Sequence, residues 1–147
     1  MLIEINYMME EHLDEVAALE KECFSEPWSR DAFGDTLNKD EYIYIVALHE
    51  GSVAGYAGAV VSFDEGSITN IAVSDEKRRI GIGKELMLQM TKLLKERNVT
   101  QIFLEVRESN EAARELYRLC GYNDVGMRKN FYNKPTENAI VMKLDIN

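Results

Sequence analysis

The chain has 147 residues, of which 46% are hydrophobic, and its formal net charge is −9 at pH 7. This length suits one domain with a single core, so we expect residues 1–147 to form one domain. The apolar content excludes a disordered chain, and the acidity argues against nucleic acid or anionic membranes as partners.

The N-terminal third of the chain predicts one strand followed by two helices. Residues 2–7 alternate between apolar and polar side chains, which is typical of a strand. From Met9 to Cys23, apolar residues recur at spacings of three and four, which predicts an amphipathic helix. Pro27 separates it from a second helix, for which Ser29 is a suitable N-cap.

Three strands are expected next. Residues 42–63 contain two apolar runs separated by Glu50-Gly51-Ser52, which indicates a hairpin. Residues 66–73 predict the third strand, in which Ile68 is out of phase with Ile71 and Val73. One extra residue in the strand would cause this slip, so we expect a β-bulge near residues 70–72.

The second half alternates helices and strands. We expect a helix after residues 77–84 that ends near Asn98, a strand over 100–106, and a helix that begins at Ser109 or Asn110 and stops at Gly121. Two closing strands are expected around residues 122–127 and 139–144. The predicted order is β-α-α-β-β-β-α-β-α-β-β, an α/β (α+β) fold whose mixed sheet has helices on both sides.

The remaining composition bears on location and metals. Cys23 and Cys120 have no metal-ligand spacing with either histidine and suggest no disulfide framework. We therefore expect no metal site and a reducing compartment. The start of the chain lacks a signal peptide, and no apolar run approaches the roughly 20 residues of a membrane span. These features predict a soluble cytoplasmic protein, as a monomer or weak dimer.

The segment KRRIGIGK, residues 77–84, is basic and contains two glycines at the start of a predicted helix. Helix N-termini bind phosphate through unpaired N–H groups and the helix dipole, although a solvated basic turn is the alternative. A P-loop is excluded because Gly81 and Gly83 are too close and Glu85 replaces the hydroxyl residue. A dinucleotide fingerprint is disfavoured because Leu86 replaces the third glycine.

Together with its flanking segments, this loop resembles the GNAT acyl-CoA N-acetyltransferase superfamily. Arg78, Gly81 and Gly83 match the signature [QR]-x-x-G-x-[GA]. The resemblance covers essentially the whole chain and is strongest to the RimI-type ribosomal-protein-alanine N-acetyltransferases. Its motifs are SEPWS at 25–29, NIAV at 70–73, LEVRESN at 104–110, A-x-x-L-Y-x-x-C-G-Y ending at 122, RKNFY at 128–132 and AIVMKL at 139–144.

The resemblance implies a GNAT-like, mostly antiparallel central sheet and acetyl-CoA as the cosubstrate, without a metal. It implies that Glu105 is the general base and Tyr117 the general acid for direct attack of an amine on the thioester. Val73 would supply a backbone donor to the oxyanion. The residues assigned to the cofactor are Ile71, Ala72, Val73, Arg78, Arg79, Ile80, Gly81, Ile82, Gly83, Lys84 and Asn110.

Each assignment has a structural alternative. Glu105 could be a solvated strand residue, Tyr117 has the spacing of a core residue, and Trp28 could serve packing alone. The resemblance places Trp28 and Tyr132 beside the acceptor, together with the loop over residues 130–137. One departure concerns Asn138, where the RimI pattern usually has an acid.

The predicted function is acetylation of the α-amine of a protein N-terminus, specifically the N-terminal alanine of a small-subunit ribosomal protein. One alternative is a GNAT enzyme that acetylates a small-molecule amine. Another is a CoA-binding regulatory module without turnover.

Overall fold

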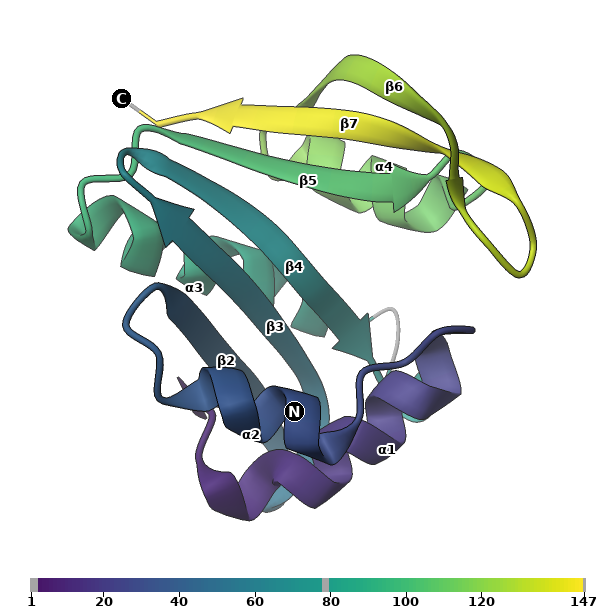
Figure 1. Ribbon diagram of the computed structural model, residues 1–147. Coiled ribbons are helices and arrows are strands. Elements are labelled where there is room, and N and C mark those ends of the chain that lie inside the picture. The colour runs from purple at the N-terminus through teal and green to yellow at the C-terminus, as the bar shows by residue number, and fades with distance from the viewer. Residues whose placement is uncertain (1–2, 78–79, 147) are drawn as a thin grey trace.

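The computed structural model describes residues 3–77 and 80–146. Within these residues, seven strands form one sheet in the order β1-β2-β3-β4-β5-β7-β6 (Figure 1). The strands are β1 (Glu4–Tyr7), β2 (Tyr42–His49), β3 (Ser52–Ser62), β4 (Glu65–Val73), β5 (Gln101–Arg107), β6 (Asn123–Tyr132) and β7 (Glu137–Asp145). The helices are α1 (Leu13–Cys23), α2 (Arg30–Leu37), α3 (Ile82–Glu96) and α4 (Glu111–Leu119), with short 3-10 turns at Glu10–His12 and Asp75–Lys77.

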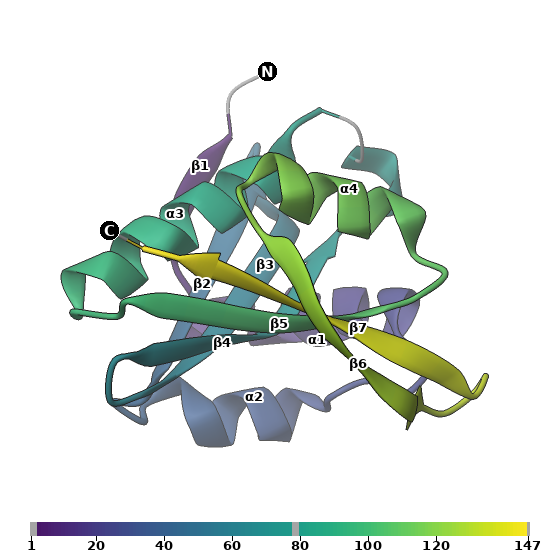
Figure 2. The same ribbon diagram turned by 90° about the horizontal axis from the view of Figure 1, so that it is seen from above.

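The helices cover both faces of the sheet, as predicted. Figure 2 shows α3 and α4 on one face and α1 and α2 on the other. The side chains of Leu86 and Met90 from α3 are buried in a cluster under the first face. A second cluster joins Phe33 of α2 to Tyr56 of β3 under the opposite face. None of the helices in the described part of the chain is long and apolar enough to cross a membrane.

The centre of the sheet splits between β4 and β5. Among the strand pairings of residues 3–77 and 80–146, these neighbours are the one parallel pair, and they are paired only where Glu65–Ser67 lies beside Gln101–Phe103. Beyond those residues the two strands diverge like the arms of a V (Figure 1). The diverging edges leave backbone groups outside any strand ladder, so the split is where a ligand can pair with the sheet.

The predicted β-bulge is present, one residue earlier than expected. Asn70 pairs with Gly58 and Ile68 pairs with Ala59, so Thr69 is the extra residue of β4. The bulge returns Ile71 to the face that Ile68 also occupies, against the cluster that includes α3. The break in hydrophobic alternation thus predicted a bulge correctly, but it did not show that Thr69 is the extra residue.

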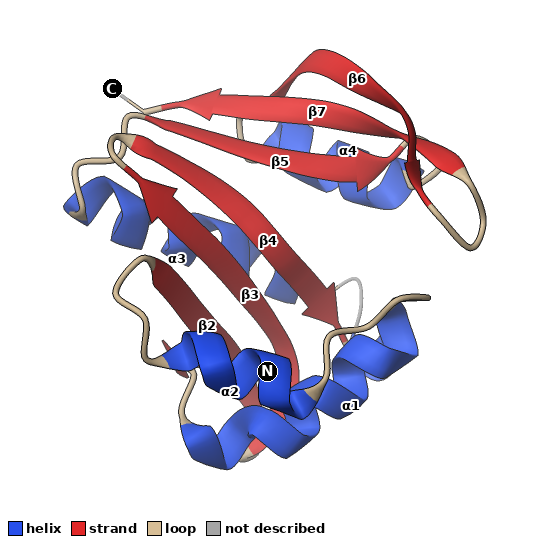
Figure 3. Cartoon of the chain, in the orientation of Figure 1, coloured by secondary structure: helices blue, strands red, loops and turns tan. Residues whose placement is uncertain are grey.

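The predicted element order is confirmed, and so are both helix caps. The Ser29 hydroxyl accepts a hydrogen bond from Ala32 N at 3.1 Å, and Asn110 Oδ1 accepts one from Ala113 N at 3.2 Å. The predicted end of β6 at residue 127 was wrong, because the strand continues to Tyr132 and pairs there with Glu137. A register shift and a positive φ at Asn130 interrupt the strand, which made it look like a loop in the sequence. The connecting turn spans only residues 133–136 (Figure 3).

Candidate active site

A pocket of about 460 Å³ occupies the split between β4 and β5. One wall comes from β4 and another from β5, while the end of α1 and the segment before α2 close one side and the end of β6 closes another. The side chains predicted for catalysis and for the acceptor meet here. The lining includes Glu105, Tyr117, Trp28, Tyr132 and Asn110.

Glu105 projects from β5 into this pocket and is one-third exposed. Its Oε2 lies 3.3 Å from Arg128 Nε, and its side chain is 33% exposed. The pair is open to solvent, so its contribution to stability is small. The pKa of the Tyr132 phenol is raised to about 12, mainly by burial and to a lesser extent by the nearby charge of Glu105. The carboxylate therefore faces the pocket, which disfavours the reading of Glu105 as an ordinary solvated strand residue.

Tyr117 is both a core residue and a pocket residue. The side chain is 6% exposed and packs against Tyr122 at a ring separation of 6.2 Å, yet it lines the pocket. Burial raises the pKa of the Tyr117 phenol above its ordinary value. The phenol therefore stays protonated at neutral pH, as a proton donor requires.

Trp28 lies in the segment between α1 and α2, and a buried acid holds this segment in place. The backbone N–H of Trp28 donates to Glu20 Oε2 at 2.8 Å, and the Trp28 ring lies 5.4 Å from the ring of Phe33. Glu20 is only 2% exposed. The packing role of Trp28 and its place at the pocket are therefore compatible.

Arg107 fastens the β6–β7 hairpin to the end of β5. Its Nη2 donates to Asn133 O at 2.9 Å and its Nη1 to Pro135 O at 3.0 Å, while the guanidinium lies 4.5 Å from the centre of the Tyr132 ring. Arg107 follows Glu105 by two residues, so both side chains lie on the same face of β5. One residue therefore sets the position of Tyr132 and Asn133 beside the proposed base.

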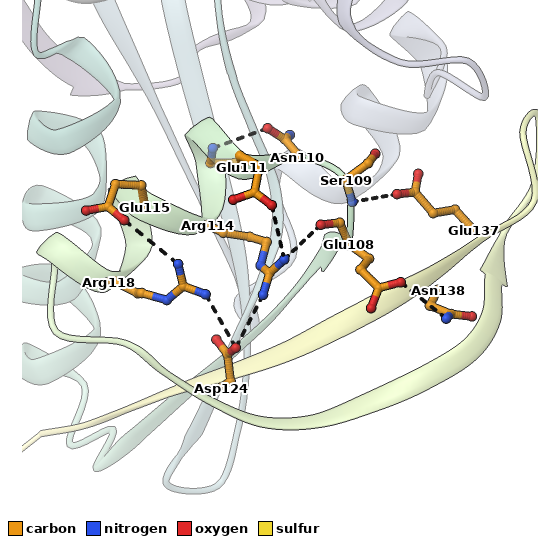
Figure 4. A network of polar contacts seen from close by, with 11 residues as sticks. Glu108, Ser109, Asn110, Glu111, Arg114, Glu115, Arg118, Asp124, Glu137 and Asn138 are labelled. Carbon is orange, nitrogen blue, oxygen red and sulfur yellow. Dashed lines mark hydrogen bonds and ion pairs between the residues drawn. The ribbon is translucent and has the colours of Figure 1, made fainter.

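Glu137 extends this attachment to the turn before α4 (Figure 4). It accepts a hydrogen bond from Ser109 N at 2.6 Å and one from Arg107 Nη1 at 3.2 Å. Its pKa is lowered from the ordinary value of 4.5 by the hydrogen bond to Ser109 and, to a lesser extent, by Arg107. The hairpin that bears Tyr132 and the turn that bears Asn110 are thus joined.

Asn138 explains the departure from the RimI pattern. Its Nδ2 donates to Glu108 Oε1 at 3.4 Å (Figure 4). Its Oδ1 accepts a hydrogen bond from Asn130 N at 2.9 Å. An acid at position 138 would place a second carboxylate beside Glu108, whereas the amide donates to it. The substitution fits its neighbour and leaves the hairpin ordered.

The edge of β4 that faces the split offers two backbone donors. The N–H of Ser74 donates to Ala54 O of β3 at 2.8 Å. Since successive N–H groups of a strand point to opposite edges, those of Val73 and Ile71 point toward the split and that of Ala72 toward β3. Three residues were predicted to align the pantetheine arm. Of these, Ile71 and Val73 have N–H groups that point toward the split, where the arm would lie, and Ala72 does not.

Residues 79–84 are the segment predicted to bind the pyrophosphate of CoA, and we call them the phosphate cradle. Its described residues lie at the N-terminus of α3. Gly81 has a φ of 90° and precedes the helix, and a Cβ there would meet nothing within 4 Å. The helix then begins with Ile82, Gly83 and Lys84, whose N–H groups belong to the first turn. Ile82 is 1% exposed, and its side chain belongs to the core cluster rather than to a binding surface. Arg78 and Arg79 lie outside the described residues.

Gly83 also has a packing role that the sequence did not reveal. A Cβ at this position would lie 3.0 Å from Leu116 Cδ2, so the first turn of α3 approaches α4 closely. This contact brings the cradle next to the helix that carries Tyr117. The described residues therefore present the kinds of donor that CoA needs, with helix N–H groups at α3 for phosphate and strand N–H groups on β4 for the pantetheine arm.

Sequence reasoning missed three polar residues of the site. Glu20 follows Val16 by four residues and so lies on the buried stripe of α1, which was the available signal. Asn70 belongs to the NIAV motif and Arg107 to the LEVRESN motif, and neither motif predicts a role for these side chains. Their hydrogen-bond partners lie 8 to 50 residues away, so apart from the buried stripe of α1 no local pattern could show these contacts.

Comparison with known proteins agrees with this geometry. The model of the Acetyltransferase (GNAT) family matches residues 13–122. A Bacillus subtilis protein is 36% identical over 144 residues, which cover 97% of this chain and 95% of that protein. The [ribosomal protein bS18]-alanine N-acetyltransferase of Haemophilus influenzae is 37% identical over 129 residues, covering 84% and 86%. The crystal structure of the Escherichia coli ribosomal-protein-S18-alanine N-acetyltransferase superposes with a TM-score of 0.90 at 31% identity, covering 99% and 95%.

Proposed function

Because this chain belongs to the GNAT acetyltransferase family, we propose that it transfers the acetyl group of acetyl-CoA to the N-terminal alanine of ribosomal protein bS18. One observation carries the proposal: a single pocket brings together a carboxylate, a buried phenol and the indole of Trp28 in the split of the sheet. A site of this composition suits acyl transfer to an amine without a covalent enzyme intermediate.

We assign the general base to Glu105. A protein α-amine has a pKa of roughly 7.7–8.0, so most of it carries a proton at neutral pH. Glu105 Oε2 contacts Arg128, and we assign acceptance of the amine proton, through a water molecule, to Oε1. Arg128 then holds the carboxylate in one orientation while the amine attacks.

Acetyl-CoA supplies the thioester carbonyl that the amine attacks. Ile71 would hold the pantetheine arm through its N–H group, and Asn110 through its side-chain amide, whose Oδ1 already caps α4, while Val73 lies beside the thioester end of the arm. The residues from Ile80 to Lys84 would bind the pyrophosphate, and Arg78 and Arg79 belong to the same assignment. Val73 N–H is also the proposed donor to the developing oxyanion. Tyr117 donates the proton that the leaving sulfur requires.

The acceptor is tested by mass spectrometry in two arms. In the first, purified protein and acetyl-CoA are incubated with an alanine-starting peptide from the N-terminus of bS18, a polyamine and an aminoglycoside. The proposal expects acetylation of the peptide on its α-amine and none of the small amines. In the second, ribosomal proteins are compared between cells with and without this protein. A bS18 N-terminus that stays acetylated in its absence would refute the acceptor assignment.

A further inference from the structure

A group of buried polar side chains lies at the side of the pocket that α1 covers. Glu20 of α1 accepts hydrogen bonds from Trp28 N at 2.8 Å, from Asn70 Nδ2 at 3.5 Å and from the Tyr56 hydroxyl. Glu20 and Asn70 both line the pocket, although they are only 2% and 7% exposed. The mechanism above uses neither of them.

The bulge at Thr69 delivers Asn70 to this place. In a regular strand Asn70 would share a face with Ile68, which packs with the cluster beneath α3. The extra residue reverses the alternation, so Asn70 shares its face with Ala72, which belongs to the cluster beneath α1 and α2. The irregularity in β4 thus turns an amide side chain toward Glu20 and Trp28.

Glu20 fixes which way the Asn70 amide points. Both Glu20 oxygens accept hydrogen bonds, Oε2 from Trp28 N and Oε1 from the Tyr56 hydroxyl, and it is Asn70 Nδ2 rather than Oδ1 that faces Oε1. Asn70 Oδ1 is then left buried, and among the described residues it has no hydrogen-bond partner. A buried carbonyl oxygen without a donor is unfavourable unless a ligand supplies one.

We propose that Asn70 Oδ1 accepts a hydrogen bond from the N-terminal amine of the acceptor peptide. This assignment rests on the proposed function and adds a binding residue to the same pocket. The ligand class is a primary amine at the start of a peptide, which keeps two N–H groups after Glu105 has taken the proton. One of them bonded to Asn70 would direct the lone pair of the nitrogen.

The pantetheine arm of CoA also contains N–H donors, but the geometry favours the acceptor. The phosphate cradle at Gly81 lies at the N-terminus of α3, so the cofactor is expected from the α3 side of the sheet. Asn70 instead faces α1 and lies beside Glu20, which holds Trp28. A neutral amide also suits a positioning contact, because it cannot take the proton assigned to Glu105.

The test combines Asn70→Ala with two peptides. The substrate is the alanine-starting peptide, and the second is its des-amino analogue, in which a propionyl group replaces alanyl. The analogue cannot react and is measured as a competitive inhibitor. In Asn70→Ala the KM of the substrate should rise roughly tenfold, the factor that corresponds to one lost hydrogen bond. The inhibition constant of the des-amino peptide and the KM of acetyl-CoA should stay within twofold of wild type.

Two variants separate recognition from structure. Tyr56→Phe removes a different donor to Glu20 and keeps Asn70, so it should lower the melting temperature while preserving the preference for the amine over its des-amino analogue. Asn123→Ala removes an exposed asparagine from β6 and should behave like wild type.

The outcomes distinguish the two proposals. Equal weakening of both peptides in Asn70→Ala would overturn the contact, and a rise confined to the KM of acetyl-CoA would move it to the pantetheine arm. If the wild-type protein acetylates the peptide but Asn70→Ala is unchanged, only the Asn70 assignment fails. If the wild-type protein acetylates no peptide, the proposed function fails, and calorimetric binding of the two peptides in the presence of CoA still tests Asn70.

Discussion

Replacement of Arg107 by methionine should weaken acceptor binding without affecting the cofactor. The guanidinium makes hydrogen bonds of 2.9, 3.0 and 3.2 Å to Asn133 O, Pro135 O and Glu137 Oε1, and it lies 4.5 Å from the Tyr132 ring. Methionine has a similar length and none of these donors. The end of the hairpin that carries Tyr132, residues 132–137, would lose the side-chain contacts that hold it beside β5, while the β5–β7 strand pairing remains.

The size of the effect follows from these contacts. A net hydrogen bond contributes about 1 kcal/mol and an exposed contact of a cation with an aromatic ring about 0.5–1 kcal/mol. Water can satisfy the two exposed carbonyl oxygens once Arg107 is gone, so we expect a loss of about 2 kcal/mol from the attached state of the hairpin. This free energy corresponds to a fall of up to about 30-fold in the population of that state, and the KM of the peptide rises by up to the same factor.

Steady-state kinetics with separate titrations of peptide and acetyl-CoA measure this effect. Arg107→Lys keeps the charge but not the planar fork, so its KM for the peptide should lie between wild type and Arg107→Met. Arg97→Met removes an arginine that donates to Asp40 O far from the pocket and should leave both KM values unchanged. A peptide KM within twofold of wild type in Arg107→Met would refute the role of Arg107, and equal increases in both KM values would indicate general loss of structure instead.

Three further predictions concern catalysis, pH and packing. Glu105→Gln should slow acetyl transfer by roughly 10²–10⁴-fold while the calorimetric affinity for CoA is retained, and wild-type rates would remove Glu105 from the mechanism. Because the folded-state pKa of Glu137 is lowered from 4.5, its carboxylate stabilises the protein above that pH and loses the effect as the pH falls below it. The difference in melting temperature between wild type and Glu137→Gln should therefore shrink below pH 4.5, and a difference that grows there would contradict the assigned sign. Gly58→Ala should lower the free energy of unfolding in urea by about 1–3 kcal/mol, since a Cβ would lie 2.7 Å from Tyr44 Cδ1 in a packed core. Gly126→Ala, where a Cβ would meet nothing within 4 Å, is the matched control, and equal stability of the two variants would contradict the steric argument.

The element order and the two helix caps were predictable because local rules govern them. Helical and strand periodicity depends on neighbours two to four residues away, and the Ser29 and Asn110 caps depend on the first turn of their own helices. The end of β6 was missed for the opposite reason. Its last residue, Tyr132, pairs with Glu137 of β7, and the neighbouring Asn133 O accepts a hydrogen bond from Arg107, which lies 26 residues earlier in the chain. Local sequence patterns do not show such contacts.

The sequence by itself determined the family resemblance, the nature of the proposed base and acid, and the presence of a β-bulge. Residue types at fixed spacing carry that information. The tertiary structure decided that β4 and β5 separate after Ser67, that Asn70 faces α1, and that Glu20 and Arg107 hold the two walls of the pocket. These features depend on contacts between residues 8 to 50 positions apart, and only the folded chain brings such residues together.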